Sequence, residues 1–589
     1  MNTLLDLLSQ EAGKAFAEAG YDAALGRVTV SNRPDLCEYQ CNGAMAGAKQ
    51  YHKAPIQIAG EVAEKLSGSA YFSEVAAVAP GFLNLKVSEG ALAEYLKEVA
   101  ADEKFGTPLP EKPLKIILDY GGANVAKPLH VGHLRSAIIG EALKRMLRYA
   151  GHEVIGDVHL GDWGLQMGLV IAAIEEKQPE LVYFDPGFTG TYPEEAPFTI
   201  SDLEEIYPKA SARSKEDADF KAKAMEATHQ LQIGNPGYRA LWDQMMKVSL
   251  KDLKKNYDSL NVTFDLWKGE SSVQDRIPAM VQRLKDEGYA YLSDGALVVD
   301  VKEDTDTKEM PPCMILKSDG ASLYNTTDLA TMEERVELYH PDWMVYMTDK
   351  RQSLYFEQVF RCARKTGIVP GDTKLTFLGF GTMNGTDGKP FKTRDGGVMR
   401  LEMLIGDTRA EMLRKIREGR PVTEEEAQAT ADIVALAAIK YGDLSNQASK
   451  DYIFDIDRFT SFEGDTGPYI LYTVVRIKSI LAKYEENGGR IPARDALVPA
   501  VGEDEKKLQM VLSGFGAMMA GAAQELAPHK LCGYLYDLAN AFNKFYHETP
   551  ILAETDPVRR EGLVALLVLA RDVLETAVHA LGFDAPSKM

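Results

Sequence analysis

Short hydrophobic runs alternate with helical patterns through the middle of the chain. The run from Leu114 to Leu118 predicts a buried parallel strand, and apolar side chains recur at helical spacing from Leu134 to Leu147. Strands that alternate with helices are typical of a parallel sheet covered by helices on both faces. The pattern over residues 109–404 therefore predicts a doubly wound, Rossmann-like α/β domain. Further strands are expected at Ala296–Val301, Trp343–Met347 and Leu375–Phe380.

The pattern changes on both sides of this domain. Residues 1–108 begin with a helical pattern, contain a strand-like run at Gly81–Val87 and end near a proline-rich linker, which predicts a small α+β domain. From about residue 175 to 258 the chain is polar and helical in pattern, so we expect an insertion in the central domain. Residues 405–589 predict an all-α helical bundle. Its helices are expected at Ile433–Tyr441, Gly467–Ala482, Lys506–Leu526, Leu531–Phe545 and Arg560–Leu581.

The composition fits a large protein with several cores. A chain of 589 residues, 45% of them hydrophobic, is too long for one core and should form three or four domains. No stretch is apolar enough to span a bilayer and the N-terminus lacks a signal-peptide pattern, so we expect a cytoplasmic protein. The five cysteines are scattered, which favours reduced thiols over a disulfide framework.

The net charge of −21 would repel a nucleic acid at long range. Any RNA contact must therefore depend on local positive charge. Two basic runs could supply it, although each could equally be a solvated helix face. The first contains Lys350, Arg351, Arg361, Arg364 and Lys365, and the second contains Arg414, Lys415, Arg417 and Arg420.

Two histidines stand where the first predicted strand of the central domain gives way to a helix. In the sequence Asn124–Ser136, Gly132 falls at the helix mouth, where unpaired backbone amides and the helix dipole attract anions. His130 and His133 are three residues apart and can donate hydrogen bonds to the same phosphate group. A chance pattern is the alternative, but the surrounding glycine and cations favour a nucleotide site. The added positive charge comes from Lys127 and Arg135.

This frame resembles the His-Ile-Gly-His signature of class I aminoacyl-tRNA synthetases. Together with His159–Gly164 (His-Leu-Gly-Asp-Trp-Gly), the string Ala123–Ser136 is similar to arginyl-tRNA synthetases. The resemblance covers nearly the whole chain. It implies a monomeric ligase that joins L-arginine to tRNA(Arg) through an arginyl adenylate, with Mg²⁺-bound ATP as substrate and without a structural metal. It also implies that residues 1–108 contact the tRNA and that residues 405–589 bind the anticodon.

Acidic residues offer a basis for recognising arginine. A planar guanidinium pairs best with carboxylates that accept two parallel hydrogen bonds. The chain offers Glu270 and Asp328, and Tyr324 would share a helix face with Asp328. Taken singly, they could be a loop charge, a helix-surface acid and a half-buried aromatic. The string Leu316–Thr331 resembles the family pattern in which the matching Tyr and Asp contact arginine. The resemblance places further residues in this site: Gly122 and Ala123, where the family commonly has Ser-Pro, and Asn124, His130 and Gln352.

A second phosphate-binding element is expected after the last predicted strand. Class I synthetases usually carry a Lys-Met-Ser-Lys-Ser loop, which this chain lacks. Gly388–Gly397 stands in its place as a cationic loop that contains Lys392, and many arginyl-tRNA synthetases resemble it in this departure. A simple β-hairpin turn is the alternative. The resemblance implies that His130, Gly132, His133 and Lys392 bind ATP and that His130, His133, Lys127 and Lys392 act in catalysis.

The helical pattern Asp537–Glu548 carries aromatic and polar side chains, which suit stacking on single-stranded RNA bases. Phe542 and Phe545 are expected in the core. By resemblance to the family, Tyr546 and the C-terminal Met589 contact the anticodon.

Two other functions remain open at this level. A small-molecule nucleotidyltransferase would share the histidine chemistry but would not need the helical region of about 180 residues. A synthetase-like binding or regulatory protein would keep the fold without turnover, against which the intact His130, His133, Asp328 and Lys392 argue.

Overall fold

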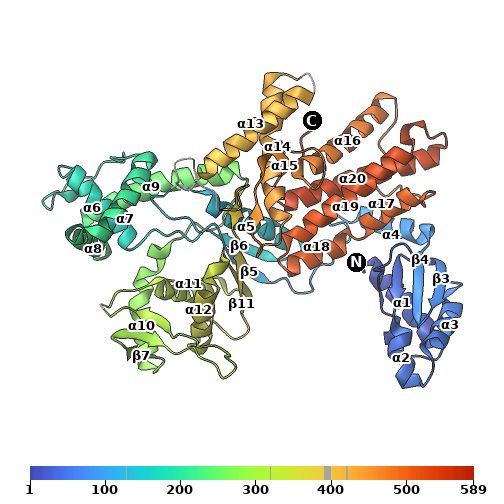
Figure 1. Cartoon of the computed structure of the whole chain (residues 1–589), viewed down its shortest axis with the longest axis horizontal. Coiled ribbons are helices and arrows are strands. Elements are labelled where there is room, and N and C mark those ends of the chain that lie inside the picture. The colour runs from blue at the N-terminus through green and yellow to red at the C-terminus, as the bar shows by residue number, and fades with distance from the viewer. Residues whose placement is uncertain (128, 319, 390–398, 420–421) are drawn as a thin grey trace.

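A four-stranded parallel sheet forms the centre of the molecule (Figure 1). The computed structural model describes all residues except 128, 319, 390–398 and 420–421. The sheet has the strand order β11-β10-β5-β6, and each neighbouring pair is parallel. Ile116, Ile117 and Leu118 are buried, as expected of a strand covered on both faces. The strands are β5 (Lys115–Asp119), β6 (Glu153–Asp157), β10 (Trp343–Asp349) and β11 (Lys374–Phe380).

Helices connect these strands in the predicted α/β arrangement. Helix α5 (Val131–Tyr149) joins β5 to β6, and α12 (Ser353–Lys365) joins β10 to β11 through the short η4 (Lys350–Gln352). Helix α11 (Tyr324–Tyr339) precedes β10. The fold class predicted from the hydrophobic pattern is confirmed for this central domain.

Two strand assignments differ from the prediction. The run that begins at Ala296 forms β8 (Ala296–Val299), but β8 belongs to a separate antiparallel sheet of order β7-β8-β9. The parallel sheet instead includes β6, which the sequence pattern did not reveal because Glu153 and Gly156 interrupt its hydrophobic run. Hydrophobicity predicts an extended segment but does not choose its partner strand. The neighbouring elements are α10 (Ile277–Asp286), β7 (Ala290–Ser293) and β9 (Cys313–Leu316).

A small α+β module lies at one end of the molecule (Figure 1), as predicted for the start of the chain. Its antiparallel sheet has the order β1-β2-β4-β3, and Leu8 and Phe16 of α1 are buried in its core. The elements are α1 (Leu4–Glu18), η1 (Ala23–Gly26), β1 (Val28–Val30), β2 (Tyr39–Cys41), α2 (Gly43–Tyr51), α3 (Pro55–Leu66), β3 (Phe72–Val78), β4 (Phe82–Val87) and α4 (Glu89–Ala101).

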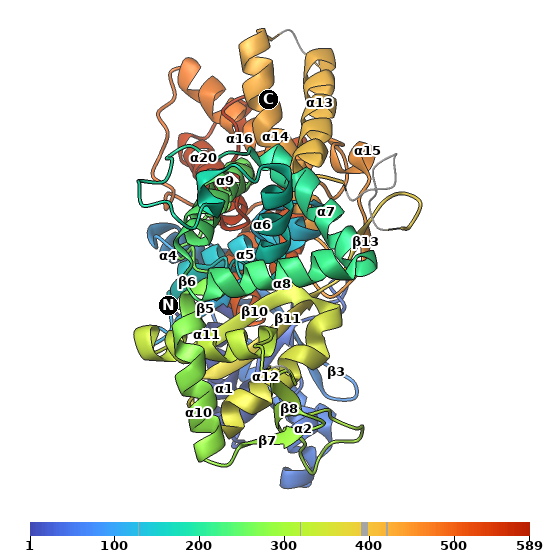
Figure 2. The same ribbon diagram turned by 90° about the vertical axis from the view of Figure 1, so that its left-hand side faces the viewer.

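A helical region extends from the sheet at the opposite end of the molecule (Figures 1 and 2). It includes the predicted insertion. The chain returns to the sheet through residues 260–270, where the N–H of Asp265 donates to the carbonyl of Gly156 at 2.9 Å. The elements are α6 (Leu165–Lys177), η2 (Val182–Phe184), α7 (Ile200–Glu216), α8 (Ala218–Gln232), α9 (Pro236–Ser259) and η3 (Glu270–Arg276).

The last third of the chain is a helical bundle, as predicted. The expected helix Lys506–Leu526 is divided into two helices at Gly514. Two short strands, β12 (Met383–Asn384) and β13 (Tyr452–Ile453), pair at the junction with the central domain. The helices are α13 (Leu401–Gly419), α14 (Glu424–Leu444), α15 (Ile456–Phe459), α16 (Gly467–Glu486), α17 (Glu503–Ser513), α18 (Phe515–Gln524), α19 (Pro528–Glu548), η5 (Ile551–Ala553) and α20 (Pro557–Ala580).

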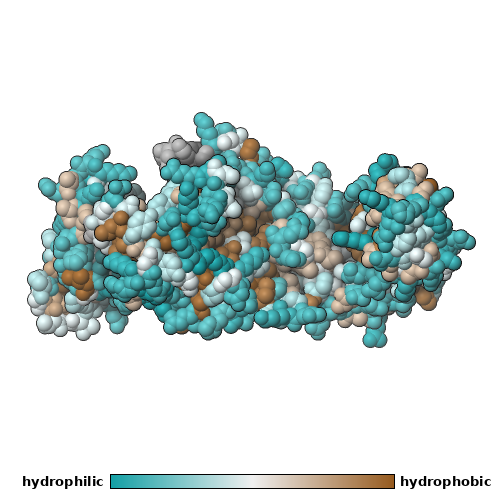
Figure 3. Space-filling model, turned by 90° about the horizontal axis from the view of Figure 1, so that it is seen from below, coloured by the Kyte–Doolittle hydropathy of each residue, from teal (hydrophilic) through white to brown (hydrophobic). Residues whose placement is uncertain are grey.

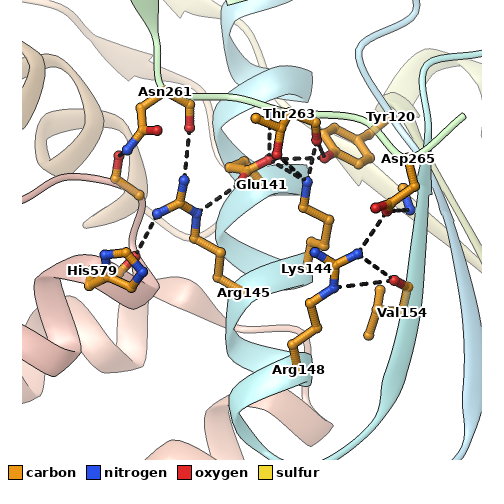
Figure 4. A network of polar contacts seen from close by, with 12 residues as sticks. Tyr120, Glu141, Lys144, Arg145, Arg148, Val154, Asn261, Thr263, Asp265 and His579 are labelled. Carbon is orange, nitrogen blue, oxygen red and sulfur yellow. Dashed lines mark hydrogen bonds and ion pairs between the residues drawn. The ribbon is translucent and has the colours of Figure 1, made fainter. Parts of the chain in front are cut away.

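Helix α5 joins three parts of the molecule through a polar network (Figure 4). Arg145 donates to the carboxylate of Glu141 at 2.7 Å, and to the carbonyls of Asn261 and His579, each at 3.2 Å. Asn261 lies at the start of the return from the insertion and also donates from its side chain to the carbonyl of Gly582, just after α20. Helix α5, the insertion and the bundle therefore meet at one point.

The face of the molecule in Figure 3 is largely hydrophilic. Many charges of the two basic runs are paired: Arg361 with Asp306 and Arg414 with Glu418, for example. These pairs favour solvated helix faces over RNA-binding runs. Among the described residues, no helix is long and apolar enough to cross a membrane.

Candidate functional site

The predicted site residues gather where β5 and β10 end. Parallel strands present their carboxyl ends at one edge of a sheet, which is where open α/β sheets bind ligands. Residues 120–130 follow β5 at this edge, and Gln352 on η4 follows β10. Residues 158–162 follow β6 and pair with the loop after β5, since Asn124 forms an isolated parallel bridge with Gly161.

The two predicted histidines cap helix α5. Nδ1 of His130 accepts a hydrogen bond from the N–H of Gly132 at 3.0 Å, and Nδ1 of His133 accepts one from the N–H of His130 at 3.2 Å. The ring centres are 4.0 Å apart. Because both Nδ1 atoms are acceptors, each neutral ring carries its proton on Nε2. Both rings can therefore donate from Nε2 to a ligand.

Their environment keeps both imidazoles neutral. Burial and the nearby charge of Lys127 lower the pKa of His130. Burial, together with the neighbouring His130, lowers the pKa of His133 to about 3. Neutral rings at physiological pH are hydrogen-bond donors that add no full charge of their own. Gly132 leaves room for this arrangement, because a Cβ there would lie 2.7 Å from Cε1 of His130.

The two cations expected beside the histidines, Lys127 and Arg135, have different surroundings in the structure. The ammonium of Lys127 lies 4.2 Å from the centre of the Tyr207 ring on α7. Arg135 is 1% exposed and binds Asp443 of α14 at 3.0 Å. The expectation that Arg135 adds charge to a phosphate site is therefore wrong, because its position on the inner face of α5 makes it part of the junction with the bundle.

Three carboxylates converge beside the loop that follows β5. Burial, followed by the charges of Asp328 and Asp162, raises the pKa of Glu270 to about 8. Burial also raises the pKa values of Asp328 and Asp162. A cationic ligand would relieve this repulsion, so the cluster is suited to a guanidinium.

Neighbouring side chains hold these carboxylates in place. The hydroxyl of Tyr355 donates to Oδ2 of Asp328 at 2.5 Å. Asp162 accepts hydrogen bonds from the N–H of Ser271 at 2.9 Å and from its hydroxyl at 2.6 Å. Asp162 lies within the His-Leu-Gly-Asp-Trp-Gly string, so the sequence carried a signal for it. Tyr355 gave no sequence signal as a site residue.

The other residues predicted to contact arginine lie around this cluster. Tyr324 is 69% exposed on the first turn of α11, and its pKa is raised by burial of its hydroxyl and by Glu270. Gly122 is exposed with a φ of +57°, a conformation that favours glycine. Ala123 is buried and Asn124 half-buried, whereas Gln352 is exposed on η4. The structure thus brings Tyr324, Glu270 and Asp328 together, whereas Gln352 is exposed three residues before Tyr355 in the chain.

The predicted loop lysine, Lys392, lies outside the described residues. The chain immediately after that segment pairs with the histidine motif: the N–H of Val131 donates to the carbonyl of Met399 at 3.1 Å, and that of Leu401 to the carbonyl of Leu129 at 3.0 Å. Met399 and Leu401 therefore lie beside the histidine motif.

The residues predicted to contact RNA lie in the bundle. Tyr546 is 37% exposed on α19 and stacks on Phe542 at 6.0 Å, while Phe542 and Phe545 are buried as expected. Arg476 of α16 lies 5.9 Å from the Tyr546 ring centre. These two residues line a cavity of about 450 Å³. Met589 is half-buried against the core of the bundle.

Comparisons with known proteins agree over the whole chain. Residues 2–87 match the arginyl tRNA synthetase N terminal domain, residues 96–456 the class I (R) tRNA synthetase catalytic domain, and residues 470–589 the DALR anticodon binding domain. The chain is 60% identical to an arginine–tRNA ligase of Agathobacter rectalis and 53% identical to one of Alkaliphilus oremlandii, and each comparison covers 100% of both chains.

Solved structures share the fold. The arginyl-tRNA synthetase of Plasmodium falciparum superimposes with a TM-score of 0.81 at 22% identity, and that of Thermus thermophilus with a TM-score of 0.77 at 24% identity. Both comparisons cover 100% of each chain.

Proposed function

This chain belongs to the arginyl-tRNA synthetase family, and on that premise we propose that it ligates L-arginine to tRNA(Arg) at the expense of ATP. One observation carries the proposal. Two neutral histidines, which cap the N-terminus of α5 through their Nδ1 atoms, lie at the same edge of the sheet as a buried group of carboxylates. The first feature suits a triphosphate and the second suits a guanidinium. A small-molecule nucleotidyltransferase would not account for the matched anticodon-binding domain.

In the first step, the carboxylate of arginine attacks the α-phosphorus of ATP, which enters with Mg²⁺ as substrate, and pyrophosphate leaves. The Nε2–H groups of His130 and His133 donate to the charge that develops toward pyrophosphate, and the N-terminus of α5 at Gly132 adds backbone dipoles. Lys127 and Lys392 supply positive charge. The chemistry is mainly positioning and electrostatic stabilisation.

Recognition of arginine rests on the carboxylate cluster. We assign the guanidinium to Glu270 and Asp328, because two fixed carboxylates can accept its forked donors. Tyr324 and Gln352 border this end of the site, and Gly122, Ala123, Asn124 and His130 border the other end, toward the reacting carboxylate. The ammonium of lysine lacks this planar fork and could not make two parallel hydrogen bonds to one carboxylate.

In the second step, the arginyl group passes to the terminal ribose of tRNA. We assign Tyr546 and Met589 to anticodon contacts, because an exposed aromatic ring beside Arg476 can stack on an RNA base. By family resemblance, the module over residues 1–108 contacts the tRNA elsewhere and the bundle over residues 405–589 binds the anticodon. The central domain spans residues 109–404 and contains the insertion at about 175–258. We further propose a monomer that acts in the cytoplasm, as the family resemblance implies.

Exchange of labelled pyrophosphate into ATP tests this function. We expect exchange that requires arginine and, as in the family, tRNA(Arg). His133→Ala should reduce the rate about 100-fold, because one well-aimed donor in such a site is worth about 3 kcal/mol. Exchange without arginine would favour a nucleotidyltransferase, and a folded chain without any exchange would favour a regulatory protein.

A further inference from the structure

The helical insertion contacts the segment that leads into the histidine motif. On α9, the fully buried Ser249 accepts a hydrogen bond from the N–H of Ala126 at 3.0 Å. On α7, the ring of Tyr207 lies beneath the ammonium of Lys127, 4.2 Å from the ring centre. The insertion therefore holds both the backbone and the side chain of this segment.

The backbone contact fixes an uncommon conformation. Ala126 has a φ of +63°, in the left-handed region that costs energy for a residue other than glycine. The hydrogen bond that Ala126 donates to Ser249 stabilises this turn, which sets the direction in which the side chain of the next residue, Lys127, leaves the backbone. A lysine side chain has four rotatable bonds, so a fixed backbone alone does not place its ammonium.

The same face of α7 makes a second contact beside the histidines. Glu204 lies three residues before Tyr207 and forms an ion pair with Arg400. Arg400 in turn forms an isolated antiparallel bridge with His130. Tyr207 also lies near the arginine end of the site, where its hydroxyl contributes to the raised pKa of Tyr324. One helix face of the insertion thus spans both ends of the site.

We propose that Tyr207 is a positioning residue of the first step and that its ring holds the ammonium of Lys127 at the phosphate end of the site. This inference rests on the proposed function. An aromatic face attracts an ammonium without neutralising it, whereas a carboxylate at the same place would compete with phosphate for the charge. The insertion is therefore part of the catalytic centre.

Pyrophosphate exchange with saturating tRNA tests the inference through two substitutions. Tyr207→Leu removes the ring, and we expect about a tenfold fall in kcat/KM for ATP, with the KM for arginine changed less than about twofold. Tyr207→Phe keeps the ring face and should retain nearly full activity. Tyr238→Leu, the same change in a half-buried tyrosine of α9 that packs on Phe184, is the matched control.

A double-mutant cycle shows whether the effect acts through Lys127. In a Lys127→Met background, Tyr207→Leu should cause no further loss, because the interaction is already absent. ATP kinetics of Y207L equal to those of Y238L, or an undiminished effect of Y207L in the Lys127→Met background, would overturn the inference. If thermal unfolding shows that Y207L is not folded, Tyr207→Gln takes its place with the same expected result.

The proposed function can fail separately. If the unaltered chain shows no arginine-dependent exchange with tRNA, the function and this inference fall together. If the unaltered chain is active and Y207L is indistinguishable from Y238L, the inference alone falls.

Discussion

At the scale of the residue, burial lowers the pKa of the histidines in this site and raises the pKa of the glutamate. The imidazoles of His130 and His133 lose affinity for a proton, while the carboxyl of Glu270 gains it. In both cases the neutral form is favoured because the buried site disfavours charge. Binding of a cationic ligand beside Glu270 should therefore change its protonation state.

Arginine binding should release protons near neutral pH. With a pKa of about 8, Glu270 is mostly protonated at pH 7 in the empty site, and a guanidinium favours its charged form. Affinity for arginine should rise between pH 6 and 8, by up to about tenfold per pH unit, and level off above. The same shift makes the empty protein less stable as the pH rises from about 4.5 to 8, because over this range the folded state binds the proton that the unfolded chain releases.

Isothermal titration calorimetry at pH 7 in two buffers of different ionisation enthalpy measures the released protons. Glu270→Gln should bind arginine more weakly and with a heat independent of the buffer. A heat that does not depend on the buffer in the unaltered protein would contradict the shifted pKa.

Gly132 should tolerate no side chain. A Cβ there would lie 2.8 Å from Nδ1 of His130, so Gly132→Ala should displace the ring. We expect the exchange rate to fall between about tenfold and 100-fold, because a misplaced donor loses most of its effect. The variant should unfold at an unchanged temperature, since position 132 is exposed on the first turn of α5. Gly406→Ala on α13, where a Cβ meets open space, is the control, and equal activities of the two variants would contradict the prediction.

At the scale of elements, helix α5 connects the histidines at its first turn to the bundle along its length. Arg135 lies one turn beyond the capped end and binds Asp443, Tyr452 and the carbonyls of Gly381 and Lys450. This buried ion pair fixes α5 against α14. A substitution of Arg135 or Asp443 should therefore lower the stability of the fold more than it lowers the catalytic rate.

Arg135→Met should lower the free energy of unfolding by about 3–5 kcal/mol, because it leaves the carboxylate of Asp443 buried without its cation. Adding Asp443→Asn should recover part of the loss, since the two residues are in contact. Arg33→Met, which removes an exposed pair with Asp35, should leave the free energy of unfolding nearly unchanged. Urea titrations followed by circular dichroism give these values, and an equal midpoint for R135M and R33M would contradict them.

The sequence predicted where strands and helices lie better than it predicted which strands pair with one another. The runs that begin at Leu114, Trp343 and Leu375 gave strands of the central sheet, because strands buried on both faces are continuously hydrophobic. The run at Ala296 was equally hydrophobic but pairs in a different sheet. In the site, the His130–His133 capping follows from local spacing. Tyr355 and Ser249 contact it from distant segments, and no local pattern marks them.

At the scale of the whole molecule, the N-terminal module is attached to helix α17 of the C-terminal bundle. Lys506 of α17 binds Glu38 at 2.8 Å, Glu89 at 3.1 Å and the carbonyl of Val87 at 2.7 Å. Helix α17 also packs on α4. The two modules that the family resemblance assigns to tRNA are therefore directly connected.

Lys506→Met should loosen the N-terminal module without changing the central site. We expect a larger radius of gyration in small-angle X-ray scattering and faster proteolysis in the linker at residues 107–113, because two partly buried ion pairs are lost. The KM for arginine should stay the same. Lys544→Met removes an exposed pair with Asp504 on the same bundle and should leave the scattering unchanged. A compact K506M with the linker protected would contradict this prediction.

The return segment at residues 260–270 has a practical consequence for protein engineering. It meets Gly582 at its start, through Asn261, and ends at Glu270, which we assign to the arginine site. A chimera that takes its C-terminal helices from another species should therefore keep a compatible residue 261, because a change at Gly582 reaches, 321 positions earlier in the sequence, the segment that leads to Glu270.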